Sequence, residues 1–80
     1  MEIIVHRVNN SSKLHKIPKN YGIEIDVRDY KTKLILSHDP FKSGESLEQF
    51  LKKYNHGTLI LNIKSEFIEA SAIKLLKKFN

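Results

Sequence analysis

The chain has 80 residues, of which 40% are hydrophobic and 29% are charged, and it contains no cysteine. This length predicts a single domain spanning residues 1–80, and the balanced composition excludes a disordered or fibrous chain. Without cysteine the chain forms neither disulfides nor thiolate metal sites, which favours a reducing, cytoplasmic setting.

Fourteen Lys and Arg residues against nine Asp and Glu give a net charge of +5, which favours an anionic partner. The lysines are scattered, and aromatic residues do not alternate with them as in a base-stacking surface. The net charge is therefore the only feature that favours a small nucleic-acid-binding protein, and we do not expect one. No run approaches the roughly 18 apolar residues of a membrane span, and the charged N-terminus is unlike a secretory signal. The sequence predicts a soluble protein that is not exported.

The first predicted element is a buried strand over residues 2–7, a run rich in β-branched residues that ends in His6 and Arg7. The segment 8–22 mixes Asn, Ser, Lys, Pro and Gly without a period. It predicts a loop with at most one helical turn.

The second predicted strand covers residues 23–30, where apolar and charged residues alternate. This period of two places Glu24 and Asp26 on the same face. Two neighbouring carboxylates repel each other and lose hydration when buried, which suggests a bound cation or a shared proton. The solvated face of an ordinary edge strand would give the same alternation, and that alternative stays open.

A tight turn at residues 29–32 predicts a hairpin that leads into a third strand over residues 34–36. The polar residues Ser37, His38 and Asp39 follow, and the Asp39-Pro40 pair ends the regular structure.

Two amphipathic helices flank the most apolar run of the chain, residues 58–63, which predicts a buried strand. Ser46 and Gln49 form a capping box for the first helix, and Ser65 is placed to cap the second. The apolar residues at helical spacing are Leu47, Phe50, Leu51 and Tyr54 in the first helix, and Ile68, Ala72, Leu75 and Phe79 in the second. The predicted order is β-β-β-α-β-α, typical of an α/β fold with parallel strands.

Polar residues follow three of these strands, and they include His6 with Arg7, His38 with Asp39, and Asn62 with Lys64. In α/β folds the carboxyl ends of parallel strands form the active-site face. We therefore expect these groups to lie together. His15 and His56 lack this setting, and we expect them to be structural.

The runs IIVHR, YGIEIDVRDYKTKLILSHDP and LEQFLKKYNHGTLILNIK, within residues 3–64, resemble the N-terminal part of the glycerophosphodiester phosphodiesterase family. That family has strands ending in His-Arg, carrying Glu-x-Asp-Val, ending in His-Asp and ending in Glu-x-Lys. The resemblance implies a (β/α)8 TIM barrel of the phosphatidylinositol phospholipase C type, which binds Ca²⁺ or Mg²⁺ and cleaves a phosphodiester.

Carried over to this chain, the resemblance implies His6 and His38 as acid and base, with Lys64 as a further catalytic residue. Arg7 would contact phosphate, and the metal ligands would be Glu24, Asp26 and Asn62. The chain departs from the family at Asn62, where the family has a Glu, and at Val8, where it has a Gly. The family's Glu-Asn-Thr element and first helix are also missing. Arg7 and Lys64 could instead form structural ion pairs with the carboxylates.

The sequence thus predicts a phosphoric diester hydrolase that acts on a small phosphodiester. Eighty residues are too few for a closed barrel, which needs about 200 or more, so we expect an incomplete barrel that is inactive alone. Its open sheet edges would favour self-association. The alternative is a non-catalytic barrel remnant that binds a phosphorylated ligand or a partner protein.

Overall fold

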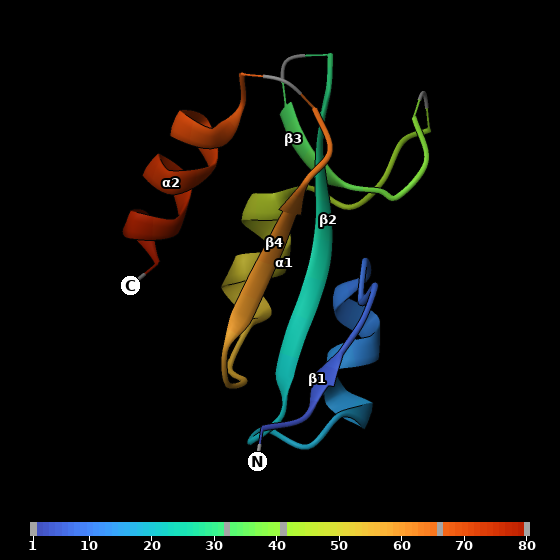
Figure 1. Cartoon of the computed structure of the whole chain (residues 1–80), viewed down its shortest axis with the longest axis vertical. Helices are drawn as coiled ribbons and strands as arrows, with labels where there is room; N and C mark the ends of the chain where they lie inside the picture. Colours follow the sequence, from blue (N-terminus) through green and yellow to red (C-terminus); the bar gives the residue numbers. More distant parts are fainter. Residues whose placement is uncertain (1, 32, 41, 66, 80) are drawn as a thin grey trace.

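The computed structural model describes residues 2–31, 33–40, 42–65 and 67–79. It is a small mixed α/β domain with one four-stranded sheet (Figure 1). Its elements in chain order are β1 (Ile4–Val5), the 3₁₀ helix η1 (Ser11–Lys16), β2 (Gly22–Tyr30), β3 (Lys33–Leu36), α1 (Leu47–Lys53), β4 (Leu59–Ile63) and α2 (Glu69–Lys78). Within these ranges no helix is long and apolar enough to cross a membrane.

Strand β2 is the centre of the sheet, because each of the other three strands pairs with it. β1 and β4 run parallel to β2 on its two sides. Ile23 of β2 lies opposite Val5 of β1 and opposite Leu59 of β4. β3 runs antiparallel and pairs with the second half of β2, from Val27 to Tyr30. The sheet is therefore mixed, with a parallel part formed by β1, β2 and β4 and a hairpin extending from β2.

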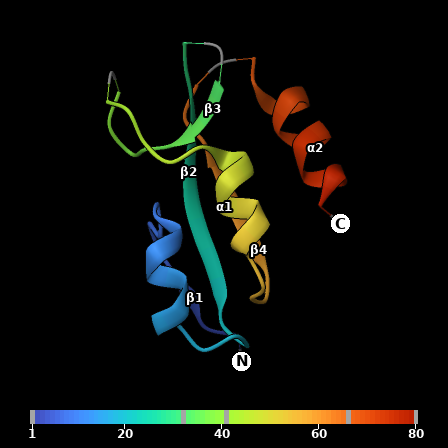
Figure 2. The ribbon, with the colours of Figure 1, turned by 180° about the vertical axis from the view of Figure 1, so that it is seen from behind.

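All helices lie on one face of this sheet. Figure 1 shows the strands in front of η1 and α1, and the reverse view in Figure 2 shows these helices in front of the strands. α2 lies to one side of α1 and is tied to it by an ion pair of 3.2 Å between Lys78 Nζ and Glu48 Oε2. The opposite face of the sheet is left without a helical layer in the described part of the chain.

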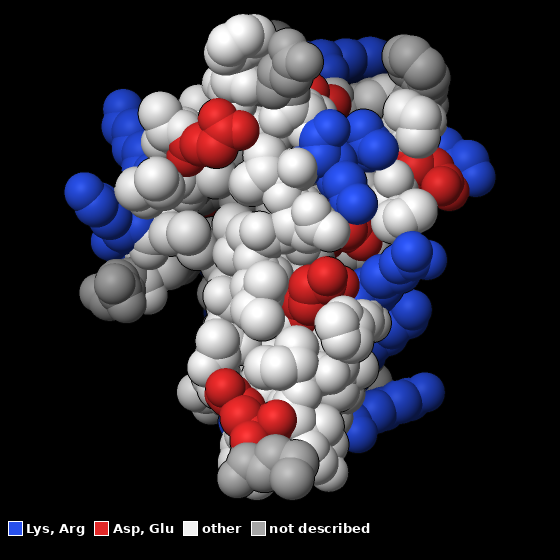
Figure 3. All heavy atoms as spheres, in the orientation of Figure 1, with Lys and Arg blue, Asp and Glu red and all other residues white. Residues whose placement is uncertain are grey.

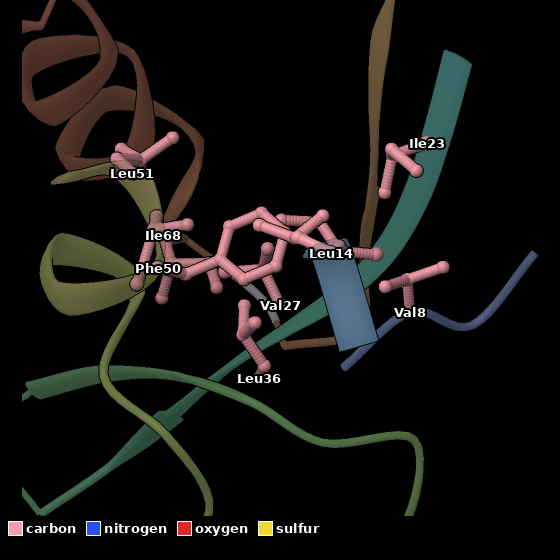
Figure 4. Packing of buried hydrophobic residues seen from close by; sticks show 10 residues of the cluster. Val8, Leu14, Ile23, Val27, Leu36, Phe50, Leu51 and Ile68 are labelled. Atoms are coloured by element: carbon pink, nitrogen blue, oxygen red, sulfur yellow. The ribbon is translucent and has the colours of Figure 1, made fainter. Parts of the chain in front are cut away.

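The core fills the space between the sheet and the helices (Figure 4). Phe50 and Leu51 of α1, together with Ile68 beside α2, pack against the side chains of β2. The β2 residues in this core are Ile23, Ile25 and Val27, all fully buried. Because side chains alternate along a strand, Glu24, Asp26 and Arg28 project from the other face.

The predicted strands and helices are present, with several corrected boundaries. The first strand is only Ile4–Val5, and segment 8–22 contains η1, whose six residues make it longer than the one helical turn expected. Ser46 Oγ accepts a hydrogen bond from Gln49 N–H, as a cap should.

The expected cap of the second helix is wrong. α2 has no side-chain cap, and Ser65 Oγ instead accepts a hydrogen bond from Asp29 N–H at 3.2 Å. The run 58–63 was expected to be a buried strand, but Ile60 of β4 is 43% exposed. Ile60 lies opposite Glu24 of β2 and projects from the sheet face that has no helical layer. Both corrections have the same reason: the contacts of a residue in or after a strand depend on the neighbouring parts of the fold.

Candidate functional site

The uncovered face of the sheet brings together most of the residues that the sequence singled out. In the parallel pairing of β2 with β4, Asp26 lies opposite Asn62, and Glu24 lies opposite Ile60. Paired residues on parallel strands share a face and are separated by about 4.8 Å. Glu24, Asp26 and Asn62 therefore form one group of oxygen-bearing side chains. Figure 3 shows acidic and basic side chains side by side along this face.

Asp26 is the most buried charged residue of the group, with 1% of its surface exposed. Its Oδ2 accepts a hydrogen bond of 3.0 Å from Asn9 Nδ2, and Lys64 Nζ lies 3.8 Å from its Oδ1. A buried carboxylate is stable only when it is paired and hydrogen-bonded. Asn9 and Lys64 supply these interactions, from the loop after β1 and from the end of β4.

Glu24 is contacted by the segment that leaves β1. Arg7 N–H donates a hydrogen bond of 3.0 Å to Glu24 Oε1, and His6 Nδ1 lies 3.6 Å from the same oxygen. Arg7 has a φ angle of 55°, a left-handed conformation that is costly for a residue with a side chain. After this turn Val8 N–H donates to Glu24 O, so the chain returns to β2. The turn thus holds His6 beside Glu24.

The predicted hairpin of β2 and β3 is confirmed, and His38 follows β3. The expectation that His38 lies at the carboxyl end of a parallel strand is therefore wrong, because the two strands of a hairpin are antiparallel. Arg28 Nη2 donates a hydrogen bond of 3.0 Å to His38 O, and Ser37 N–H donates to Asp26 O. Strand β3 runs back along β2, which places its end beside the middle of β2.

The side chain of His38 has its own acidic neighbour, Asp39, whose Oδ1 lies 3.4 Å from His38 Nδ1. The hydrogen bond with His38, followed by that with Lys42, lowers the pKa of Asp39 from its usual value of 3.8. An ionised carboxylate only accepts hydrogen bonds, so His38 carries its proton on Nδ1 in this pair. Its Nε2 is then left as the basic nitrogen.

The loop that carries His38 is held against the outer edge of β3. Leu36 N–H donates to Glu45 O, and Ile35 forms a bridge with Ser46. Gly44 is required for this close approach, since a Cβ atom at that position would lie 2.1 Å from Leu36 O. Glu45 Oε1 also accepts a hydrogen bond of 2.7 Å from Ser11 N–H, which links the loop to η1.

The donor set on this face fits a hard divalent cation in its chemistry, because Glu24, Asp26 and Asn62 offer oxygen ligands. It contains only two carboxylates, and the described residues include no group of three His, Cys, Asp or Glu close enough to hold a metal ion. Lys64 supplies positive charge next to Asp26. Any metal would therefore share this face with an ammonium group.

Sequence reasoning missed Asn9 and Arg28, which position the buried Asp26 and the backbone of His38. Asn9 lies in a polar segment without periodicity, where no sequence feature distinguishes it from the neighbouring Asn10. Arg28 carried a signal, because it shares the Glu24 and Asp26 face by alternation.

The two histidines expected to be structural differ in setting. His56 Nε2 lies 3.1 Å from Leu14 O and 2.9 Å from Ile17 O, so it donates to the carbonyls at the end of η1. His15 is exposed on η1 itself. Among the described residues, His56 bonds to the η1 region and not to the uncovered face of β2.

The structure thus defines a class: a small mixed α/β domain whose uncovered sheet face carries two carboxylates, an amide and several cationic groups. Comparisons with protein-family models, with curated proteins and with solved structures give no match. The function of this face is therefore argued from its own geometry.

Proposed function

We propose that this chain forms the first part of a phosphodiesterase-type barrel and that its uncovered sheet face binds and cleaves a phosphodiester. The proposal combines the resemblance of residues 3–64 to the glycerophosphodiester phosphodiesterase family with the arrangement of charged groups around β2.

The topology supports the barrel part of the proposal. β1, β2 and β4 are parallel and neighbours in the order β1, β2, β4, and all helices lie on one face. In a (β/α)8 barrel consecutive parallel strands are adjacent, and the helices form an outer layer around a helix-free interior. A doubly wound sheet would have helices on both faces. Three parallel strands cannot close a barrel, so closure would require further strands.

The observation that carries the catalytic part is the pairing of each candidate histidine with a carboxylate. His6 Nδ1 lies 3.6 Å from Glu24 and His38 Nδ1 lies 3.4 Å from Asp39. A carboxylate at Nδ1 orients the imidazole and leaves Nε2 to exchange a proton with substrate. One histidine would remove a proton from the attacking hydroxyl or water, and the other would protonate the departing alkoxide.

The cationic groups would bind the phosphate itself. The side chain of Arg7 is exposed after β1, and Lys64 is half-buried beside Asp26. Either could donate charge-assisted hydrogen bonds to the non-bridging oxygens, whose negative charge grows in the transition state. A Ca²⁺ or Mg²⁺ ion held by Glu24, Asp26 and Asn62 would polarise a phosphoryl oxygen.

The test is hydrolysis of glycerophosphocholine by the purified chain, and by any longer chain that contains it, with Ca²⁺ or Mg²⁺ added. In an active protein, His6→Ala and His38→Ala should each reduce turnover about 100-fold or more, the scale of a general acid or base. His15→Ala, which changes an exposed histidine on η1, is the matched control. If both His6→Ala and His38→Ala kept the parent rate, the assignment would be wrong.

A second candidate, a non-catalytic module that binds a phosphorylated ligand, is favoured by one observation. Both oxygens of Asp26 already have partners, Asn9 and Lys64, and the residue opposite is the neutral Asn62. A cation is then not needed to stabilise the carboxylate. Saturable binding of glycerophosphocholine without turnover, unaffected by a metal chelator, would support this function over hydrolysis.

A further inference from the structure

A pocket lined by cations lies at the far end of β2 and β4, next to the site described above, with which it shares Arg28 and Lys64. The pocket, of about 490 Å³, opens between the β2–β3 turn, the loop after β3 and the segment after β4. Three cationic residues line it, Arg28, Lys31 and Lys64, against one carboxylate, that of Asp29. The lining therefore carries a net charge of about +2 from these four side chains.

The guanidinium of Arg28 is only partly satisfied within the described structure. Its Nη2 donates to His38 O at 3.0 Å, whereas its Nε is buried and has no hydrogen-bond partner among the described residues. Buried polar groups nearly always have a partner, so an unpaired guanidinium N–H requires an explanation. Arg28 lines the pocket, so an oxyanion bound there would give the guanidinium a further acceptor, since arginine binds such groups through two parallel N–H donors.

Two more donors face the same pocket. Ser65 Oγ accepts a hydrogen bond from Asp29 N–H, which leaves its hydroxyl proton available to donate. Lys31 belongs to the turn after β2, and its Nζ lies 5.6 Å from the centre of the Tyr30 ring. The cation–π contact holds the ammonium at the mouth of the pocket. Donors thus arrive from the end of β2, from the turn and from the segment after β4.

We propose that this pocket binds a phosphate dianion, either inorganic phosphate or the terminal phosphate of a small phosphomonoester. A dianion matches the charge of the lining better than a singly charged diester, and its oxygens can accept from a guanidinium, an ammonium and a hydroxyl together. Of the lining cations only Lys64 also has a role in the proposed reaction, so phosphate binding in this pocket can be tested without diester cleavage.

The probes are inorganic phosphate, methyl phosphate and dimethyl phosphate, titrated into the protein at constant ionic strength and followed by the amide NMR signals of Asp29 and Ser65. Both dianions should bind saturably and at least 5-fold tighter than the monoanion dimethyl phosphate. A stronger response to methyl phosphate than to inorganic phosphate would identify the phosphomonoester as the ligand, and the reverse would identify free phosphate.

Arg28→Gln should weaken phosphate binding about 10-fold or more. Lys31→Asn changes an exposed residue of the turn, leaves the core intact and should weaken phosphate binding several-fold. Lys52→Gln, which removes the same charge from the exposed side of α1, should change it less than 2-fold. Equal binding by the parent and Lys31→Asn, or equal weakening by Lys52→Gln, would overturn the proposal. Saturable phosphate binding by a parent protein that cleaves no glycerophosphocholine would support the pocket while removing the proposed hydrolase.

Discussion

Asn9 and Asp26 hold each other by two hydrogen bonds. Asn9 Nδ2 donates to Asp26 Oδ2 at 3.0 Å, and Asp26 N–H donates to Asn9 Oδ1 at 2.8 Å. The amide side chain thus takes the place of a neighbouring strand at this point of β2, after β1 has ended. It also satisfies a carboxylate that is 1% exposed.

Asn9→Ala should lower the free energy of unfolding by about 2–3 kcal/mol, because it removes the hydrogen bonds to Asp26 Oδ2, which is buried, and to the Asp26 backbone N–H. Urea unfolding followed by circular dichroism measures this as a lower midpoint at an unchanged slope. Asn55→Ala, at an exposed asparagine near the end of α1, should have an effect within about 0.5 kcal/mol. Similar stability of the two variants would contradict the role of Asn9.

A divalent cation should bind to the uncovered face if its oxygen donors act together. Glu24→Gln should weaken Ca²⁺ or Mg²⁺ binding, and Asn62→Glu should strengthen it about 10-fold by adding a charged ligand beside Asp26. Isothermal titration calorimetry measures both effects. Glu48→Gln removes the same charge from α1, where Glu48 pairs with Lys78, and should leave binding unchanged. Identical titrations of the parent and Glu24→Gln would refute the site.

The lowered pKa of Asp39 depends on His38 first and on Lys42 second. His38→Ala and Lys42→Gln should therefore each raise the pKa of this carboxyl toward 3.8. NMR titration of the carboxyl carbon follows both changes. An unchanged pKa of Asp39 in His38→Ala would show that the histidine contact is absent in solution.

The same shift has a defined consequence for stability. Because the pKa of Asp39 is lower in the folded chain than in the unfolded one, its contribution is present above pH 3.8. That contribution is lost as the pH falls through the folded value. We expect the loss of stability between pH 5 and pH 3 to be smaller in His38→Ala than in the parent. Acid titrations at fixed urea concentration provide the measurement.

Phe67 adopts a φ angle of 65° and is 90% exposed, so its side chain contributes little packing while its backbone is strained. Phe67→Gly should raise the free energy of unfolding by about 0.5–1 kcal/mol, since glycine adopts this conformation without the steric cost. Lys74→Gly, within α2 and equally exposed to solvent, should lower it by about 0.5–1 kcal/mol. Destabilisation by both changes would indicate that the turn at Phe67 differs in solution.

The outer edge of β4 should mediate self-association. Ile23 N–H donates to Thr58 O and Lys64 N–H donates to Val27 O, so the even-numbered positions of β4 direct their backbone groups toward β2. By alternation, the backbone N–H and C=O groups of the odd-numbered residues point toward the opposite edge; these residues are Leu59, Leu61 and Ile63. Within the described residues β4 pairs with β2 alone, and an open edge of this kind pairs readily with another chain.

Light scattering should therefore show an apparent mass that increases with concentration, and hydrogen exchange at Leu61 should slow in parallel. Ile60→Lys places a charge on this strand and should suppress the association. Ile73→Lys makes the same change at an exposed residue of α2 and should not. A monomer at all concentrations, or equal effects of the two variants, would contradict the prediction.

The local patterns of the sequence determined much of the fold. Alternation over residues 23–28 predicted both faces of β2, because a strand has a side-chain period of two whatever lies next to it. The helical spacing of Leu47, Phe50 and Leu51 predicted the buried side of α1, and Ser46 caps the helix through a bond within its own first turn. These features depend on residues a few positions apart.

The partners of β2 were decided only by the tertiary structure. Asp26 lies opposite Asn62 because β4 pairs in one register, which is selected by burial of Leu59, Leu61 and Ile63 against the core, over a separation of 36 residues. The hairpin of β2 and β3 was predicted from the local sequence, but the contact of Ser37 N–H with Asp26 O and the bond of Ser65 to Asp29, where a helix cap was expected, were not. A polar side chain takes whichever partner the assembled strands bring within reach, and only long-range packing determines which partner that is.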